Sequence, residues 1–261
     1  MPKPAFGLSM LYTLSRPFSI MLQELRKSPT KHVEIVDEGL HALNKRRVAQ
    51  LGEIAASHDL RLSMHAPFAD LNIASPSKPI LNATMKRLEK SLAYAAKLNA
   101  YLWVFHPGNK SGISSFYPEE DWKQNLQSSR KLHTIAEDYG VAIAMENLPE
   151  KYNFILTSSE DFMHFYEETS LNDIGIVLDT GHANLENQIQ PFLQQLSQKI
   201  VHIHVSDNHG TVDEHLGLGQ GNVDWQRFAA TLKEISFSGT ILTESVYNAK
   251  ETLQKLTQLF A

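Results

Sequence analysis

Cysteine is absent from this sequence of 261 residues. The chain therefore has no disulfide framework, no thiolate metal ligand and no thiol nucleophile. It also lacks an apolar run long enough to cross a membrane. Its first residues, MPKPAFGLSMLYTLSRPF, lack a signal-peptide pattern because their apolar run is short and broken by Ser, Thr and Pro. We expect a cytoplasmic protein with no membrane partner.

An excess of positive charge is missing as well. The formal net charge is −5, and this balance gives no global support for a nucleic-acid partner. What the chain does have is apolar residues, which make up 42% of the sequence and are ample for a large core. Single barrels often have this length.

Apolar segments that read as strands alternate with amphipathic helical segments along the whole chain. The expected strands are residues 5–10, 31–36, 60–64, 101–105, 141–145, 174–178, 200–205 and 240–243. The expected helices are residues 17–27, 43–58, 80–98, 118–139, 158–168, 189–196, 224–235 and 248–260. Eight such units in one chain, with no linker or repeat, favour an α/β protein with a single (β/α)8 TIM barrel over an open doubly wound sheet.

The stretch from residue 199 to residue 221 concentrates histidines and carboxylates at the end of the seventh strand. His202 and His204 are two residues apart, so they project from the same face of that strand. They are followed by Asp207, His209, Asp213 and His215, and then by a glycine-rich turn at residues 217–221. Such a cluster indicates a metal site.

The other strands end in the same residue types. Strands three to eight end in His65, His106, Glu146, Asp179, His204 and Glu244, and His182 follows Asp179 closely. In a barrel these ends converge on one mouth, where such enzymes keep their active sites. The alternative is that these residues lie in separate loops and are simply solvated. It does not explain why each of these strands ends in a residue type that can bind a metal.

Residue parity supports the same arrangement. Glu146 shares a face with Ala144, and Asp179 shares one with Val177, while their neighbours are apolar and face the helices. His202 is expected one layer below His204, as a support for the site or a packed interior histidine rather than a direct ligand.

Imidazoles and carboxylates without sulfur suit Zn, Mn, Fe or Co. Nine candidates are too many for one ion, whereas two or three ions bridged by carboxylates would use them all. These predicted metal ligands are His65, His106, Glu146, Asp179, His182, His204, Asp213, His215 and Glu244. Glu146 and Glu244 are the predicted bridging or acid–base pair, and no organic cofactor is expected.

With these motifs the sequence resembles the xylose-isomerase-like barrels, which include endonuclease IV (AP endonuclease family 2) and the sugar-phosphate isomerases and epimerases. The resemblance would make residues 1–261 a single domain of this kind. It is carried by HAP at 65, HPG at 106, EN at 146, LDTGH at 178, HVSD at 204, DEH at 213 and Glu244.

The resemblance implies two different sites. In endonuclease IV nine ligands hold three zinc ions, and the nine residues named above match all of them by motif. In the ketose epimerases, glutamates matching Glu146 and Glu244 hold a single metal and exchange the substrate proton. Ligands matching Asp179 and His204 help them, and a substrate-binding histidine matches His182. We therefore expect a divalent metal, either Zn as one to three ions or Mn, and catalytic roles for Glu146, Glu244 and His182.

Departures from both branches are visible. Leu148 to Lys151 stand where endonuclease IV usually has Gly-Gln-Gly, and acidic Asp37 and Glu38 follow strand two where a DNA backbone would pass. Gly210 stands near the place of an arginine of the epimerases.

Three hypotheses remain. We favour a metal-dependent isomerase or epimerase that moves a proton beside the carbonyl of a small carbohydrate. The second is a zinc phosphodiesterase that cleaves DNA at abasic sites, and the third is a non-catalytic metal-binding barrel.

Two secondary features have open readings. The glycines of residues 217–221 could hold a substrate phosphate or form a plain tight turn. The aromatic residues Trp103, Phe116, Tyr117, Trp122 and Trp225 could line a sugar, although packing explains most of them better.

Overall fold

The computed structural model describes residues 3–260 and forms a closed barrel of parallel strands in the order β1 to β8. The strands are β1 (Ala5–Ser9), β2 (His32–Val36), β3 (Arg61–His65), β4 (Leu102–Phe105), β5 (Ile143–Glu146), β6 (Gly175–Asp179), β7 (Ile200–Val205) and β8 (Thr240–Thr243). Parallel pairing of β8 with β1 closes the ring. The predicted TIM barrel is confirmed; residues 1, 2 and 261 of the predicted domain lie outside the described residues.

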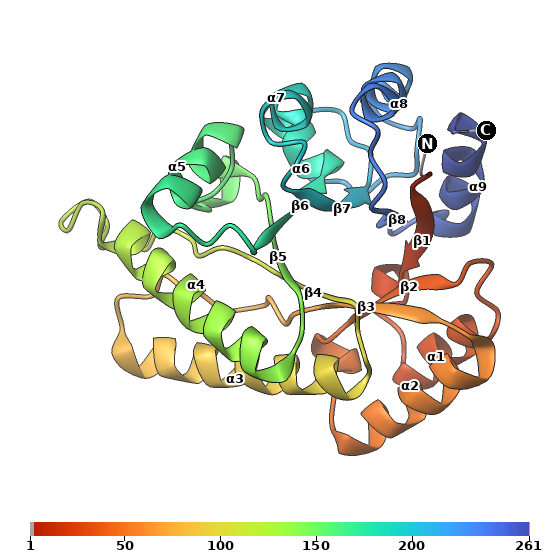
Figure 1. Ribbon diagram of the computed structural model, residues 1–261, viewed down its shortest axis with the longest axis horizontal. Helices are drawn as coiled ribbons and strands as arrows, with labels where there is room; N and C mark the ends of the chain where they lie inside the picture. Colours follow the sequence, from red (N-terminus) through yellow and green to blue (C-terminus); the bar gives the residue numbers. More distant parts are fainter. Residues whose placement is uncertain (1–2, 261) are drawn as a thin grey trace.

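Helices surround the ring of strands, and the N-terminal strand lies beside the C-terminal helix (Figure 1). They are α1 (Phe18–Arg26), α2 (Lys45–His58), α3 (Lys78–Lys97), α4 (Glu120–Tyr139), α5 (Ser159–Thr169), α6 (Thr180–Leu185), α7 (Ile189–Gln195), α8 (Trp225–Glu234) and α9 (Ala249–Leu259). The sequence did not predict α6, because six residues are too few to show a helical period.

Local sequence signals set the ends of the helices. The Ser158 side chain accepts the Asp161 N–H while the Asp161 carboxylate accepts the Ser158 N–H, which is a complete capping box at the start of α5. Gly140 ends α4 at φ 65°, a left-handed conformation that glycine adopts without strain. Both ends agree with the sequence prediction.

The strands alternate as predicted between two environments. Trp103, Phe105, Met145 and Leu178 are fully buried members of the main hydrophobic core between the strands and the helices. The side chains of the other parity, such as Ala144 and Val177, form a separate small cluster in the barrel interior. Because the ends of parallel strands share one edge of the barrel, this parity brings the polar strand-end residues together.

Across residues 3–260, no helix combines the length and the hydropathy needed to cross a membrane.

Candidate metal centre

The nine predicted ligands gather at the mouth of the barrel, defined as the C-terminal ends of its strands. They form three groups in which one donor atom of each residue lies within 4.8 Å of the others. The first group is His65, His106 and Glu146; the second is Glu146, Asp179, His204 and Glu244; the third is His182, Asp213 and His215.

The first group joins the ends of β3, β4 and β5. His65 Nε2 lies 3.1 Å from Glu146 Oε2, and His106 Nε2 lies 3.3 Å from the same oxygen. The other ring nitrogen of His65, Nδ1, is 2.8 Å from the carbonyl oxygen of Ala66. This contact fixes the imidazole so that Nε2 faces the mouth.

The second group is the most deeply buried. His204 Nδ1 lies 3.3 Å from Glu146 Oε1 and 3.3 Å from Glu244 Oε2. Asp179 stands beside them, and one of its oxygens, Oδ1, accepts the N–H of His182 at 2.7 Å. The same bond caps the start of α6, so the helix that the sequence did not predict places His182 at the site.

The third group lies nearer the solvent. Asp213 Oδ2 is 3.3 Å from His182 Nε2 and 3.0 Å from His215 Nε2, so it joins the two imidazoles. His215 has a φ of 48°, in the left-handed region that costs a non-glycine residue free energy. Such strain is common where a site holds a side chain in a required direction.

A glycine allows α6 to approach β7. A Cβ atom on Gly181 would collide with the Ser206 side chain, and it would also stand 3.2 Å from Asp179 Oδ1. Glycine in the Asp-Thr-Gly-His motif therefore lets His182 follow Asp179 directly into the mouth.

The three groups fit metal ions. Nitrogen and oxygen donors bind zinc at about 2.0–2.2 Å, so donors around one tetrahedral ion are roughly 3.3 Å apart, close to the contacts above. Glu146 gives one oxygen to the first group and the other to the second, as a bridging carboxylate would. Asp179 Oδ2, Asp213 Oδ1 and His215 Nδ1 are buried without a hydrogen-bond partner, which leaves donor capacity for a ligand.

Protons on histidines balance the charges of the carboxylates when no cation is bound. Burial lowers the pKa of His65, but the hydrogen bond and the charge of Glu146 outweigh it and raise that pKa to about 9. Asp213 outweighs burial in the same way and raises the pKa of His215 to about 9. Burial would raise the pKa of Glu146, yet the charge of His204 and the neighbouring histidines hold it well below its usual range. A bound cation would replace these protons.

A cavity of about 230 Å³ opens above the groups. Its floor holds His65, His106, Glu146, His182 and Glu244, and its other lining residues are Leu11, Val36, Phe68, Leu148, Pro149, Tyr152, Phe154, Asp213 and His215. The described residues that line it include no lysine and no arginine. The cavity is smaller than the pockets of about 300–1,000 Å³ that hold drug-sized ligands, and its size suits a small ligand.

The aromatic residues that the sequence offered as possible sugar contacts are not the ones at this cavity, and Trp103, Trp122 and Trp225 pack in or against the core as the preferred interpretation expected. None of Trp103, Phe116, Tyr117, Trp122 and Trp225 lines this cavity; instead Phe68, Tyr152 and Phe154 do. Phe68 was detectable from its place next to the HAP motif, and its ring lies 5.4 Å from those of His65 and His106. Tyr152 and Phe154 follow β5 by several residues, and only the course of the loop brings them to the mouth.

Two residues of the cluster after β7 have other tasks. His209 is exposed and pairs with Glu214 at 2.9 Å, away from the nine ligands. Asp207 is fully buried, and its carboxylate accepts the N–H groups of Gly219 and Val223 and the indole N–H of Trp225. Asp207 thus folds the loop that follows β7 rather than facing the mouth.

The glycine-rich turn is a turn and not a phosphate cradle. The N–H groups of Gly217, Leu218 and Gly219 donate to Gln220, Thr252 and Asp207 side chains, respectively. The Gln220 N–H donates to the Gly217 carbonyl oxygen. Because these amides already have acceptors inside the protein, the predicted alternative of anion binding by this loop is not supported.

Comparison with known proteins places the chain among barrels of this kind. It is 29% identical to the uncharacterized protein MJ1311 of Methanocaldococcus jannaschii, over 97% of this chain and 89% of that protein. It is 21% identical to the D-psicose 3-epimerase of Ruminiclostridium cellulolyticum, over 87% of this chain and 78% of that enzyme. It is 24% identical to the probable endonuclease 4 of Aquifex aeolicus, over 67% and 66%.

Solved structures show the same barrel fold. The crystal structure of a D-tagatose 3-epimerase-like protein superposes with a TM-score of 0.87 at 28% identity, and the match covers 98% of each chain. The family model described as "Xylose isomerase-like TIM barrel" matches residues 22–259. The chain therefore belongs to the xylose isomerase-like TIM barrel family.

Proposed function

We propose that the protein is a metal-dependent sugar isomerase or epimerase that transfers a proton at a carbon beside a carbonyl. One observation carries the proposal: Glu146 and Glu244, from strands on different parts of the ring, both face His204 Nδ1 at 3.3 Å on the floor of a small cavity. Two buried carboxylates on one metal-binding floor suit a proton transfer to and from a bound sugar.

The second group, with Glu146, Asp179, His204 and Glu244, would hold the essential divalent ion, with Zn or Mn as the candidates. When bound, the ion supplies a positive charge that polarises the substrate carbonyl and stabilises the negative charge formed after proton loss. Donors for one or two further ions would come from the remaining predicted ligands, which are His65, His106, Asp213, His182 and His215.

The two glutamates would act as base and acid. The charge of His204 outweighs the effect of burial and lowers the pKa of Glu244 below its usual value, as it does for Glu146. Both carboxylates are therefore ionised near neutral pH, and each can accept a proton from the substrate. His182 lies in the cavity lining beside Glu146 and would orient a substrate oxygen.

A ketose without a phosphate group is the substrate that the cavity favours. Two of the relatives are named for D-psicose and D-tagatose, which are ketoses. The described lining residues include no lysine or arginine to hold a phosphate, and the amides of residues 217–220 are occupied within the protein. Apolar side chains such as Phe68 and Phe154 would keep water away from the reacting carbon.

The test is exchange of substrate hydrogen with solvent. Metal-replete protein would be incubated with a panel of ketoses in D₂O, and deuterium at the carbon beside the carbonyl would be followed by NMR. We expect exchange, together with an epimer or isomer, for at least one neutral ketose and a loss of both in Glu146→Gln. Fully metallated protein that neither exchanges nor converts any ketose would exclude the proposal.

A second function is favoured by a specific observation. All nine side chains that match the zinc ligands of endonuclease IV lie at the mouth, in three groups. A cluster of ions could activate water and stabilise a leaving oxygen in phosphodiester cleavage. Against this stand the net charge of −5 and a cavity whose described lining has no lysine or arginine, since duplex binding relies on these two residue types.

Cleavage of a duplex with one abasic site would decide between the two. Metal-replete wild-type protein would be compared with Glu146→Gln on the same duplex. Cleavage that is lost in the variant would establish the nuclease and exclude the isomerase as the principal activity.

The third hypothesis, a non-catalytic barrel, expects Glu146→Gln to change only metal content. A cytoplasmic location stays a prediction.

A further inference from the structure

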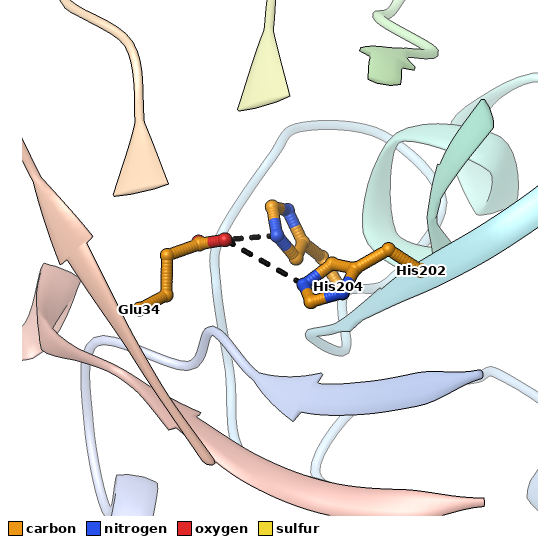
Figure 2. A group of neighbouring side chains, drawn as sticks. All are labelled: Glu34, His202 and His204. Atoms are coloured by element: carbon orange, nitrogen blue, oxygen red, sulfur yellow. Dashed lines mark ion pairs between the residues drawn. The ribbon is translucent and has the colours of Figure 1, made fainter. Parts of the chain in front are cut away.

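A carboxylate lies inside the barrel, below the nine ligands of the mouth. Glu34 extends from β2 into the interior and meets two imidazoles carried by β7, those of His202 and His204 (Figure 2). All three side chains are completely buried. Nothing in the reaction proposed above uses Glu34, although an ionised carboxylate is costly to keep in such a place.

Glu34 contacts each imidazole with a different oxygen. Its Oε1 lies 3.1 Å from His204 Nε2, and its Oε2 lies 3.5 Å from His202 Nε2. Oε2 also accepts a hydrogen bond of 3.0 Å from the hydroxyl of Ser63, which stands opposite Glu34 on β3. The shorter contact makes His204 the principal ionic partner of the carboxylate, although Glu34 Oε1 and His204 Nε2 are not aligned as a hydrogen bond among the described residues.

The His204 ring therefore lies between two sets of carboxylates. Its Nδ1 faces Glu146 and Glu244 in the mouth, each at 3.3 Å, whereas its Nε2 faces Glu34 in the interior. The two nitrogens of an imidazole point away from each other, so a charge at Nε2 decides which nitrogen keeps the proton. A proton held at Nε2 leaves Nδ1 free to bind a metal ion.

We propose that Glu34 is a positioning residue for the metal centre: it holds the proton and the orientation of His204 so that Nδ1 faces the ion bound by Glu146, Asp179 and Glu244. The inference rests on the metal centre of the proposed function but not on the reaction. Carboxylates that accept the second N–H of a ligating histidine orient the ring and raise its basicity.

The geometry favours this role over an additional ion inside the barrel. An ion between Glu34, His202 and His204 would need Nε2 of His204 as a donor, and the ring would then have to lose both protons to serve the mouth as well. The interior would offer three donors from fully buried side chains, whereas a closed structural zinc site has four.

His202 has a weaker part in the arrangement. Burial lowers the pKa of His202, partly offset by Glu34, so the ring tends toward its neutral form. It packs edge-on against His204, with the ring centroids 5.2 Å apart. It is therefore a matched control, because it is as deeply buried as Glu34 and contacts both Glu34 and His204.

The test compares Glu34→Gln with His202→Gln. Each metal-free protein would be titrated with Zn²⁺ against a chromophoric chelator and, separately, with Co²⁺ while its visible absorption is recorded. We expect Glu34→Gln to weaken the tightest site about 10–100-fold, the usual effect of removing such a partner, and to shift the Co²⁺ absorption. His202→Gln is expected to change affinity by less than this range and to keep the wild-type spectrum.

Wild-type affinity and spectrum in Glu34→Gln would overturn the inference. So would the loss of one whole equivalent of metal in both variants, because that result would place an ion in the interior. A wild-type protein that binds no divalent metal would overturn the metal centre itself, and this outcome is distinct from the two above.

A measurement on the unaltered protein gives a test that does not depend on the folding of any variant. The ¹⁵N chemical shifts of His204 in the Zn²⁺-loaded protein report which ring nitrogen carries the proton. We expect a protonated Nε2 and a metal-bound Nδ1. A metal-bound Nε2 would overturn the inference.

Discussion

The interior of the barrel has two unlike halves. Across β4, β5 and β6 its side chains are Leu102, Val104, Ala144 and Val177, a small apolar cluster. Across β2, β3 and β7 they include Glu34, Ser63, His202 and His204, all completely buried. Both halves lie in the same ring of strands and are shielded from solvent, so the fold does not require the polar one.

The contrast separates stability from function. Apolar side chains stabilise a buried position through packing and loss of water contact, whereas buried ion pairs often contribute no more than apolar residues of similar volume. The polar half lies directly beneath the carboxylates that face His204. We infer that the apolar half maintains the barrel and that the polar half maintains the metal centre above it.

The largest effect should come from the mouth above the polar half. Replacing Glu244 by Gln removes a carboxylate that would accept or return the substrate proton, and general acid–base groups contribute about 10²–10⁴-fold. We expect kcat to fall by that factor in the deuterium-exchange assay. The matched control is Glu234→Gln, an exposed residue of α8, which should leave the rate unchanged. Equal rates in all three proteins would show that the carboxylate is not part of the chemistry.

The apolar half should respond in stability alone. Leu102→Ala removes most of a side chain that is 5% exposed, and such truncations cost about 2–5 kcal/mol of unfolding free energy. Urea denaturation of metal-free protein measures the loss, with exposed Ile80→Ala as the control, for which less than about 0.5 kcal/mol is expected. A large loss of Zn²⁺ affinity in Leu102→Ala would contradict the inference that the apolar half contributes to stability alone.

The pH dependence tests whether protons and metal compete in the mouth. The carboxylates raise the pKa values of His65 and His215 to about 9, so both rings hold a proton near neutral pH. A metal ion must displace it, and affinity should rise up to about tenfold per pH unit for each such histidine that binds metal, until about pH 9. Metal-free stability should change in the opposite sense, since raised pKa values stabilise the folded state below about pH 6.5, and this contribution disappears as the pH rises toward 9.

Proton release on metal addition, followed in weakly buffered solution with an indicator dye, checks this directly. Release of no protons at pH 7 would show that the histidines are already neutral. The protonated pairs would then not balance the carboxylates in the metal-free protein.

The smallest effect on stability should come from an ion pair in contact with water, which gives a baseline for the buried pair of Glu34 and His204. Lys250 lies 2.6 Å from Glu24 and lowers the pKa of that carboxyl through a hydrogen bond. Lys250→Met should cost less than about 1 kcal/mol at pH 7. The pKa of Glu24 is lowered in the folded state. The difference in unfolding free energy between wild type and Lys250→Met should therefore be present above about pH 4.5, and it should vanish as the pH falls through the pKa that Glu24 has in the folded protein. A difference in unfolding free energy that stays constant down to pH 2 would show that the variant loses stability through packing.

The sequence determined much of the mouth. Strand period and helix period gave the alternation that closes into a barrel, and parity placed Glu146, Asp179 and His204 on inward faces, because side chains alternate along a strand. The ends of parallel strands must meet at one edge, so the nine ligand types could be grouped before any coordinates. Their roles as ligands stay a proposal.

Contacts between distant segments were decided only by the tertiary structure. Glu34 reads as one polar residue in an alternating strand, and nothing local relates it to His204, from which it is separated around the ring by β8 and β1. Phe154 enters the cavity through the course of a loop, and Asp207, which the sequence only placed in the polar cluster after the seventh strand, supports the next loop. Local sequence fixes periodicity and caps because these depend on neighbours along the chain. Which charges face one another across a barrel depends on closure of the ring, and closure depends on all eight strands together.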